Sequence, residues 1–356
     1  MIDYGPPPNS DQTEVTLFGP GFGEAIAVHL GENNWLLVDS CIDPNTGSPA
    51  ASTYLDFLGV KPEQVKTIVA SHWHDDHIRG LFALAEKYAD AEFQLSAVFT
   101  NKEASYFLAA YSGNAAPGQS RGSRELFKVV QQRDMVSFVS QRSNILELAL
   151  QNKIIRVTAL SPVNAAIAQS VAHMAQYLPQ PRGESPINHA PELKNNLESI
   201  AIHIDLGDDA ILLGADLEDH NKLGWTAVVQ DPWCSQRIPA TAYKVAHHGS
   251  VSGDTEAIWA TLLRPDPVAC LTPFSLAGQR LPTDDDRVRI RSKTPHGYIS
   301  SGSSRKPDMD RTGLKRLSDI CQNLARVDSG FGAIRLRKKE SEKSWGVECF
   351  GTAQPL

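Results

Sequence analysis

A cluster of histidines and aspartates stands out in the segment Ser71–Gly80, which reads SHWHDDHIRG. It holds three histidines and two aspartates within six residues, directly after the apolar run Val65–Ala70. Imidazole and carboxylate groups are common protein ligands of divalent transition metals, and catalytic metal sites leave one position open for water. The segment therefore predicts a metal site, against the alternative of a polar loop with solvent-exposed histidines.

The spacing within this segment divides the candidate ligands into two pairs. In an extended chain, positions two apart point the same way, so His72 and His74 can converge on one ion. Asp76 and His77 follow where a helix is expected to begin, and they could face a second ion nearby. Asp75 is predicted to cap that helix rather than to bind metal.

Further candidate ligands come at the ends of other predicted strands. Asp216 follows one buried strand, Asp39 ends another, and His247 and His248 follow a third. Acids and imidazoles delivered from several strand ends to one rim are what an active site on a sheet requires. The side chains of adjacent histidines diverge in a strand. We interpret His247 as the ligand, whereas His248 either contacts the reacting group or only hydrogen-bonds behind it.

Alternating apolar residues and turn signals predict the elements that position these residues. We expect strands at 14–18, 24–30, 35–39, 65–70, 199–204, 210–213, 243–246, 332–337 and 345–350. We expect helices at 49–58, 78–85, 103–111 and 124–150, and irregular chain at 112–123 and 161–191. Candidate site residues lie on both sides of the helical stretch. We therefore predict one α/β domain, residues 1–356, carrying a helical and irregular insertion at about 100–190.

Composition excludes several classes of protein. No run of about 18 apolar residues is present, so we expect no membrane-spanning segment and no membrane partner. The N-terminal residues lack the basic and apolar regions of a secretion signal. The five cysteines are scattered and form no CxxC pair, which favours reduced thiols and a cytoplasmic location over a disulfide framework.

Charge is distributed unevenly along the chain. The net charge of −7 argues against a protein that binds polyanions over its whole surface. Residues 264–316 nevertheless carry eleven Lys or Arg against six Asp or Glu, a local surplus of five positive charges. This stretch could meet a phosphate backbone, or it could be a solvated surface.

Several motifs resemble those of one family. The pattern HxHxDH at 72–77, followed by a strand-terminal Asp and a strand-terminal His, resembles the metallo-β-lactamase superfamily of di-metal hydrolases. Within it, the chain is most similar to the competence-type DNA-uptake nuclease branch. The motifs that carry this likeness are Phe18–Ala25, Leu37–Ser40, Asn196–Ile200, Leu212–Glu218 and Lys244–Ser250. The resemblance implies a four-layer αββα sandwich and covers residues 14 to 356, apart from 100–190.

The resemblance also implies a role for each site residue. The implied ligands are His72 and His74 for a first ion, Asp76, His77 and His247 for a second, and Asp216 between the two. Asp39 would orient a ligand imidazole. A metal-bound hydroxide would attack the substrate, with Asp76 and His248 as the expected catalytic residues. The implied cofactor is Zn²⁺, one or two ions per chain, with Mn²⁺ as an alternative.

The chain departs from the superfamily pattern at one position. A histidine usually stands about twenty residues before the bridging aspartate, but this chain has Asn195 and Asn196 there. The nearest histidines are His189 and His203, and His203 falls in the middle of a predicted strand. Asn196 or water would then complete the first site, and such an oxygen-rich shell suits Mn²⁺ as well as Zn²⁺.

Three functions remain open from the sequence. The first is a phosphodiesterase or nuclease, for which Lys293 and His296 are candidate contacts to a substrate phosphate, with a solvated turn as the alternative. The second is a hydrolase of a small ester, thioester or lactone. The third is a metal-binding subunit without catalysis, which docks a protein partner through the helices expected at 100–150.

Overall fold

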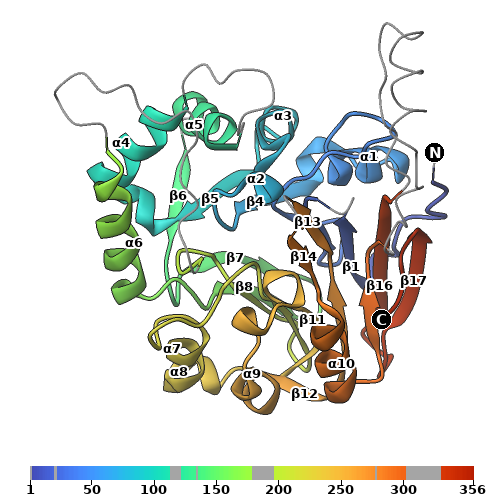
Figure 1. Cartoon of the computed structure of the whole chain (residues 1–356). Helices are drawn as coiled ribbons and strands as arrows, with labels where there is room; N and C mark the ends of the chain where they lie inside the picture. The colour runs from blue at the N-terminus through green and yellow to red at the C-terminus, as the bar shows by residue number, and fades with distance from the viewer. Residues whose placement is uncertain are drawn as a thin grey trace, which may run out of the picture.

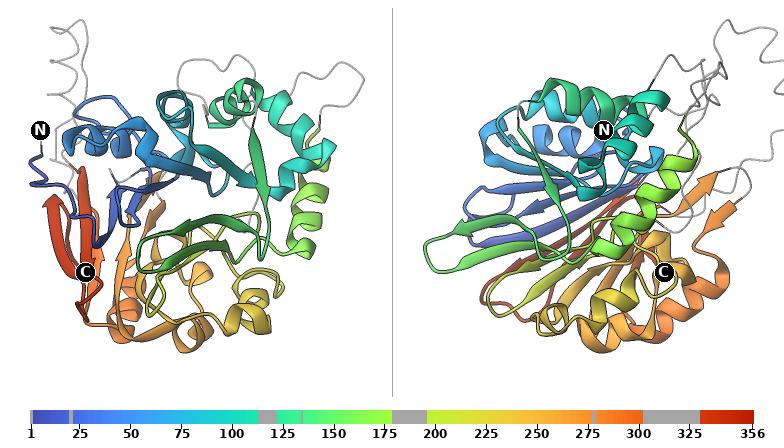
Figure 2. Two further views of the ribbon diagram at one scale, coloured as in Figure 1. Left: turned by 180° about the vertical axis from the view of Figure 1, so that it is seen from behind. Right: turned by 90° about the vertical axis from the view of Figure 1, so that its left-hand side faces the viewer.

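The computed structural model describes residues 2–19, 22–112, 122–133, 135–178, 196–276, 279–301 and 330–356. Two eight-stranded sheets pack face to face, and helices cover the outer face of each (Figures 1 and 2). This arrangement confirms the predicted four-layer αββα sandwich.

The first sheet combines the N-terminal strands with the C-terminal hairpin. Its order is β17-β16-β1-β2-β3-β4-β5-β6. Its strands are β1 Gln12–Gly19, β2 Ala25–His29, β3 Trp35–Val38, β4 Val65–Ala70, β5 Glu92–Ser96, β6 Val136–Val139, β16 Gly332–Lys339 and β17 Gly346–Gly351. The pairs β2–β3 and β16–β17 are antiparallel, as the predicted hairpins require, whereas β3, β4 and β5 run parallel.

The second sheet has the order β18-β15-β12-β11-β10-β9-β8-β7. Its strands are β7 Asn144–Ala149, β8 Ile154–Ala159, β9 Ile202–Asp205, β10 Ala210–Leu213, β11 Ala240–Lys244, β12 Leu263–Leu271, β15 Gly297–Ile299 and β18 Gln354–Pro355. Strands β10, β11 and β12 are parallel, so their carboxyl ends meet at one edge of the sheet. A separate hairpin, β13 Phe274–Leu276 with β14 Gln279–Leu281, follows β12.

The helices fall into two groups. The first sheet is covered by α1 Ala50–Phe57, α3 Leu81–Lys87, α4 Lys102–Tyr111, α5 Gly122–Gln132 and α6 Asn164–Gln176. The second is covered by α7 Trp225–Gln230, α8 Pro232–Ser235, α9 Glu256–Thr261 and α10 Asp284–Lys293. The short helix α2 Asp75–Ile78 follows β4. Of the helices in the described part of the chain, none has the length and apolar character needed to cross a membrane.

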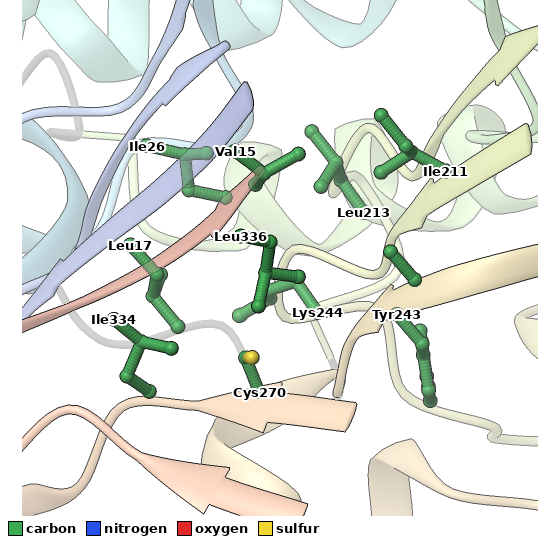
Figure 3. Close-up of a pocket in the computed structure, with 11 residues that line it drawn as sticks. Val15, Leu17, Ile26, Ile211, Leu213, Tyr243, Lys244, Cys270, Ile334 and Leu336 are labelled. Atoms are coloured by element: carbon green, nitrogen blue, oxygen red, sulfur yellow. The ribbon is translucent and has the colours of Figure 1, made fainter. Parts of the chain in front are cut away.

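Side chains along the strands point alternately toward the core between the sheets and toward the outer helices. Along β1, Val15 and Leu17 face the other sheet, whereas Thr16 and Phe18 face the helix α1. Figure 3 shows apolar side chains of both sheets meeting here, around a cavity of about 10 Å³. So small a space holds one water molecule at most, so a ligand has to bind elsewhere.

The described part of the range 100–190 contains strands as well as the helices that the sequence predicts. The helix expected at 124–150 ends at Gln132, and the strands β6, β7 and β8 follow. Strand β6 pairs with β5 and β8 pairs with β9, so this segment contributes edge strands to both main sheets. Likewise, α6 occupies part of the stretch expected to be irregular, and residues 179–191 lie outside the described residues.

Candidate metal centre

A cluster of imidazoles and carboxylates lies where strands of both sheets end. Four residues, Asp76, His77, Asp216 and His248, each offer a ligand atom, and these atoms lie within 4.8 Å of one another. Asp76 and His77 come from α2, directly after β4 of the first sheet (Figure 1), whereas Asp216 and His248 follow β10 and β11 of the second. The site therefore joins the two halves of the sandwich.

Asp216 occupies the centre of this cluster. Its Oδ1 lies 3.4 Å from Nε2 of His77, and its Oδ2 lies 3.3 Å from Nε2 of His248. Oδ2 of Asp76 lies 3.1 Å from Nε2 of His248 and 3.7 Å from Nε2 of His77. The two oxygens of Asp216 thus face the two imidazoles of this cluster, so the carboxylate lies among the other three candidate ligands.

A second set of donor atoms lies beside this cluster. The ring of His72 is 4.2 Å from the ring of His77 and 4.7 Å from that of His74, measured between centroids. Nε2 of His72, Nε2 of His74 and Oδ1 of Asn196 are buried, and none has a hydrogen-bond partner among the residues that the structure describes. Buried polar atoms are nearly always paired, so the two neighbouring imidazole nitrogens fit the ligand set of an ion, and Asn196 offers a further unpaired acceptor.

The histidine of β9 takes no part in the expected first site. His203 is buried in β9, and its Nε2 lies 2.8 Å from the carbonyl of Ile238. Asn195 and His189 lie outside the described residues. Trp73 fills the space beside His74, with its ring packed on Phe107 and its Nε1 donating to Glu198.

Asp39 orients two of the histidines, one directly and one through a serine. Its Oδ2 lies 2.7 Å from Nδ1 of His77. The backbone N–H and the hydroxyl of Ser71 both donate to Asp39, each at 2.7 Å, and the same hydroxyl oxygen lies 3.0 Å from Nδ1 of His72. With Nδ1 engaged on each ring, Nε2 is left to bind metal. The positive φ of 60° at Asp39 is uncommon outside glycine and is typical of functional sites.

The sequence did not identify Glu24, Lys244 or Thr272 as part of the site. The Thr272 hydroxyl donates to Glu24 at 2.5 Å and lies 3.0 Å from Nδ1 of His248, so Glu24 orients His248 much as Asp39 orients His77. Nζ of Lys244 lies 2.6 Å from Glu24 and 3.6 Å from Asp216. Glu24 and Lys244 each stand beside or within an otherwise apolar run of the sequence. Because buried charges need partners, this pattern could have indicated that the two residues pair.

The charges of the site are unbalanced. The carboxylates of Glu24, Asp39, Asp76 and Asp216 are all buried, whereas Lys244 is the one lysine or arginine that contacts them closely among the described residues. Burying carboxylates without compensating charge is costly. Bound cations would remove this imbalance, and the donor set of imidazole and carboxylate suits Zn²⁺ or Mn²⁺.

The pKa values of two site histidines are shifted in opposite directions. Burial alone lowers the pKa of His248, but the carboxylates of Asp216 and Asp76 raise it to about 9. Burial together with the neighbouring His77 and His74 holds the pKa of His72 well below its ordinary value. A neutral imidazole is the form that binds metal, so His72 is already in the ligating state at neutral pH.

The structure places His248, and not His247, against the carboxylates. Nδ1 of His247 lies 2.9 Å from the hydroxyl oxygen of Ser252 and 3.5 Å from Oε2 of Glu218, and His247 is not among the four residues whose ligand atoms lie within 4.8 Å of one another. The prediction of His247 as the ligand came from the resemblance to the superfamily. In the structure the strand ends at Lys244, and His247 and His248 both have positive φ values, 47° and 52°.

Lys293 and His296 do not reach the cluster. Lys293 ends α10 and pairs with Glu256, and the side chain of His296 is exposed. The carbonyl of His296 accepts from the N–H of Ala269, three residues before Thr272 along β12. Three residues of strand span about 10 Å, which separates the backbone of His296 from Thr272. The contact of Lys293 and His296 with a substrate phosphate stays a prediction.

The basic surplus at 264–316 is also partly neutralised. Arg289 pairs with Asp254 and Asp286, and Lys293 with Glu256. Its remaining basic residues from 302 onward lie outside the described residues.

Arg289 positions the loop that carries His248. Its guanidinium donates to the carbonyl of Gly249 at 2.6 Å, and it also bonds Asp254 and Asp286. Replacing Arg289 by alanine leaves both carboxylates without their partner and releases the loop. We expect a loss of about 1–3 kcal/mol in the free energy of unfolding and reduced activity, measured by urea denaturation and turnover. The exposed Arg291 on the same helix provides the control: an equal effect of Arg291→Ala would argue against a specific contact.

Comparison with known proteins supports this assignment of fold. Residues 18–105 match the family model described as metallo-beta-lactamase superfamily, and this range includes His72 and His77. Together with the two facing sheets and their outer helices, the match identifies the fold as the metallo-β-lactamase fold. No curated protein is significantly similar to the chain in sequence.

Several solved structures of metallo-β-lactamases are distantly similar. MEM-A1, a subclass B3 enzyme from a soil metagenome library, is 14% identical over 70% of this chain and 84% of its own, with a TM-score of 0.34. A motif mutant of the enzyme from Cronobacter sakazakii is 13% identical over 64% and 75%, with a TM-score of 0.35. SMB-1 bound to 2-mercaptoethanesulfonate is 12% identical over 69% and 82%, with a TM-score of 0.36.

Proposed function

We propose that this protein is a metal-dependent hydrolase that cleaves phosphodiester bonds, with nucleic acid as the substrate class. The observation that carries the proposal is that two sets of donor atoms lie side by side: the cluster of Asp76, His77, Asp216 and His248, and the ring of His72, which lies 4.2 Å from the ring of His77 between centroids and 4.7 Å from that of His74. Two donor sets this close suit a pair of adjacent ions. Two ions favour in-line displacement at phosphorus because they stabilise both the attacking and the leaving oxygen.

Two further features favour a phosphodiester over a small ester or lactone. The motifs around Asp39, Asp216 and His248 resemble those of the competence-type nuclease branch. The exposed side chain of Arg79 follows α2 directly and offers a cation for a substrate phosphate close to the cluster.

In this proposal some residues of the chain bind the ions and others orient the ligand imidazoles. Bound ions lower the pKa of water from about 15.7 toward about 7 and so supply hydroxide at neutral pH. Asp39 and Thr272 hold the rings of His77 and His248 in place. The proposed ligands are His72, His74 and Asn196 for one ion, Asp76, His77 and His248 for the other, and Asp216 for both.

The direct test is hydrolysis by purified protein with Zn²⁺ or Mn²⁺. We expect cleavage of single-stranded or double-stranded DNA and of bis(p-nitrophenyl) phosphate, loss of cleavage with a chelator, and recovery when metal is restored. A panel of lactones and thioesters serves as the comparison. If metal-loaded protein leaves every nucleic acid and model diester intact but turns over that panel, the substrate class is wrong.

Metal binding should also stabilise the protein, independently of any substrate. A ligand at about 1,000 times its Kd contributes about 4 kcal/mol, which corresponds to a rise in Tm on the order of 5–10 °C for a chain of this size. Thermal unfolding of chelator-treated protein with and without added Zn²⁺ measures this rise. An unchanged Tm, together with the absence of bound metal by elemental analysis, would contradict a metal site.

A further inference from the structure

A row of side chains leads from the metal cluster to the surface. The ring of Phe274 lies 5.3 Å from the ring of His248, and the ring of Phe22 lies 5.6 Å from Phe274, between centroids. The guanidinium of Arg79 lies over Phe22, 4.6 Å from its centroid. The three side chains come from separate segments, namely the chain before β2, the end of α2 and the hairpin β13–β14 (Figure 1).

These side chains do not serve the apolar core. Neither Phe22 nor Phe274 belongs to any of the three apolar clusters formed by the described residues. Both rings are partly exposed, and Arg79 is exposed. Arg79 forms no ion pair with any described carboxylate. Two aromatic rings and a cation without a described ion-pair partner therefore lie at the surface, and the first of the rings, Phe274, contacts the proposed metal ligand His248.

We propose that Phe22, Phe274 and Arg79 form a stacking platform for a nucleobase next to the scissile phosphate, with Arg79 binding a neighbouring phosphate. The inference rests on the proposed function and names the substrate class more closely. Aromatic side chains stack on bases at about 1–3 kcal/mol per base, irrespective of sequence. Arginine combines stacking with hydrogen bonds to phosphate oxygens.

This platform has a consequence for the form of the substrate. A base that stacks on Phe274 has to leave its neighbours in the strand, and unstacking is cheapest in single-stranded chain or at a frayed end. We therefore infer that single-stranded nucleic acid, and not the interior of a duplex, is the preferred substrate.

The experiment compares two diesters with the same leaving group, thymidine 5′-(p-nitrophenyl phosphate) and methyl p-nitrophenyl phosphate. In Phe274→Leu, which keeps apolar bulk but removes the aromatic face, we expect the ratio of kcat/KM for the nucleoside ester to that for the methyl ester to fall roughly 5- to 100-fold. Phe274→Tyr should restore the ratio. Phe22→Leu and Arg79→Ala should lower it as well.

The possible results distinguish a failure of the platform proposal from a failure of the proposed function. If Phe274→Leu lowers both rates by the same factor, the ring only supports His248 and the platform is overturned. If wild-type protein hydrolyses neither ester, the proposed function fails, and the platform is then judged by binding of a fluorescent thymidine decamer to the zinc-loaded protein. Weaker binding in Phe274→Leu supports the platform, whereas unchanged or absent binding overturns it.

Discussion

Replacing Asp216 by asparagine is expected to reduce hydrolysis on the order of 1,000-fold or more and to lower the bound metal by at least one ion per chain. Asp216 is buried, and its two oxygens face His77 and His248. The amide keeps the size of the side chain but removes its charge and one acceptor oxygen, so it cannot bridge two cations. Turnover and elemental analysis of the purified variant measure both effects.

Asp205 provides a matched control for this substitution. It is the last residue of β9, a strand of the second sheet, but its carboxylate caps an exposed turn by accepting from Gly207. Asp205→Asn should keep wild-type metal content and activity, and circular dichroism should show both variants folded. Full metal content in Asp216→Asn would show that Asp216 is not a ligand, and that result would contradict the two-ion site.

Alanine substitutions at the two adjacent histidines are expected to differ sharply. His248→Ala removes an imidazole that lies 3.1 Å from Asp76 and 3.3 Å from Asp216, and we expect activity to fall on the order of 100-fold or more, with loss of one ion. His247→Ala removes a ring that contacts Ser252 and Glu218 outside the cluster, and we expect metal content to stay unchanged.

Metal content decides between these two assignments more directly than activity does. A metal titration followed by elemental analysis gives the number of ions bound by each variant. Should His247→Ala lose an ion while His248→Ala retains both, the chain would rearrange on binding metal and the sequence prediction of His247 would be restored. His220→Ala, a histidine apart from the cluster, controls for general effects of the substitution.

Much of the fold could be predicted because its strands are marked by local pattern. The strand expected at 65–70 is β4 with the same bounds, and β10 likewise matches the run 210–213. Turn residues between apolar runs correctly predicted the β2–β3 hairpin. The edge strands β6 and β7 were not predicted because they are short and carry exposed, polar residues. Local pattern does not distinguish such a segment from a helix.

The sequence by itself predicted a metal site in the segment from His72 to His77, since so many ligand types stand together after a buried strand, and the structure gathers Asp76 and His77 of this segment into one cluster with Asp216 and His248. Only the tertiary structure decided which of the adjacent histidines faces Asp216, because two consecutive residues with positive φ reverse the directions that an extended strand would give. Likewise, Glu24 meets Lys244 across 220 residues of sequence through the packing of the two sheets. Local pattern carries no information about such contacts, because they depend on how distant strands align.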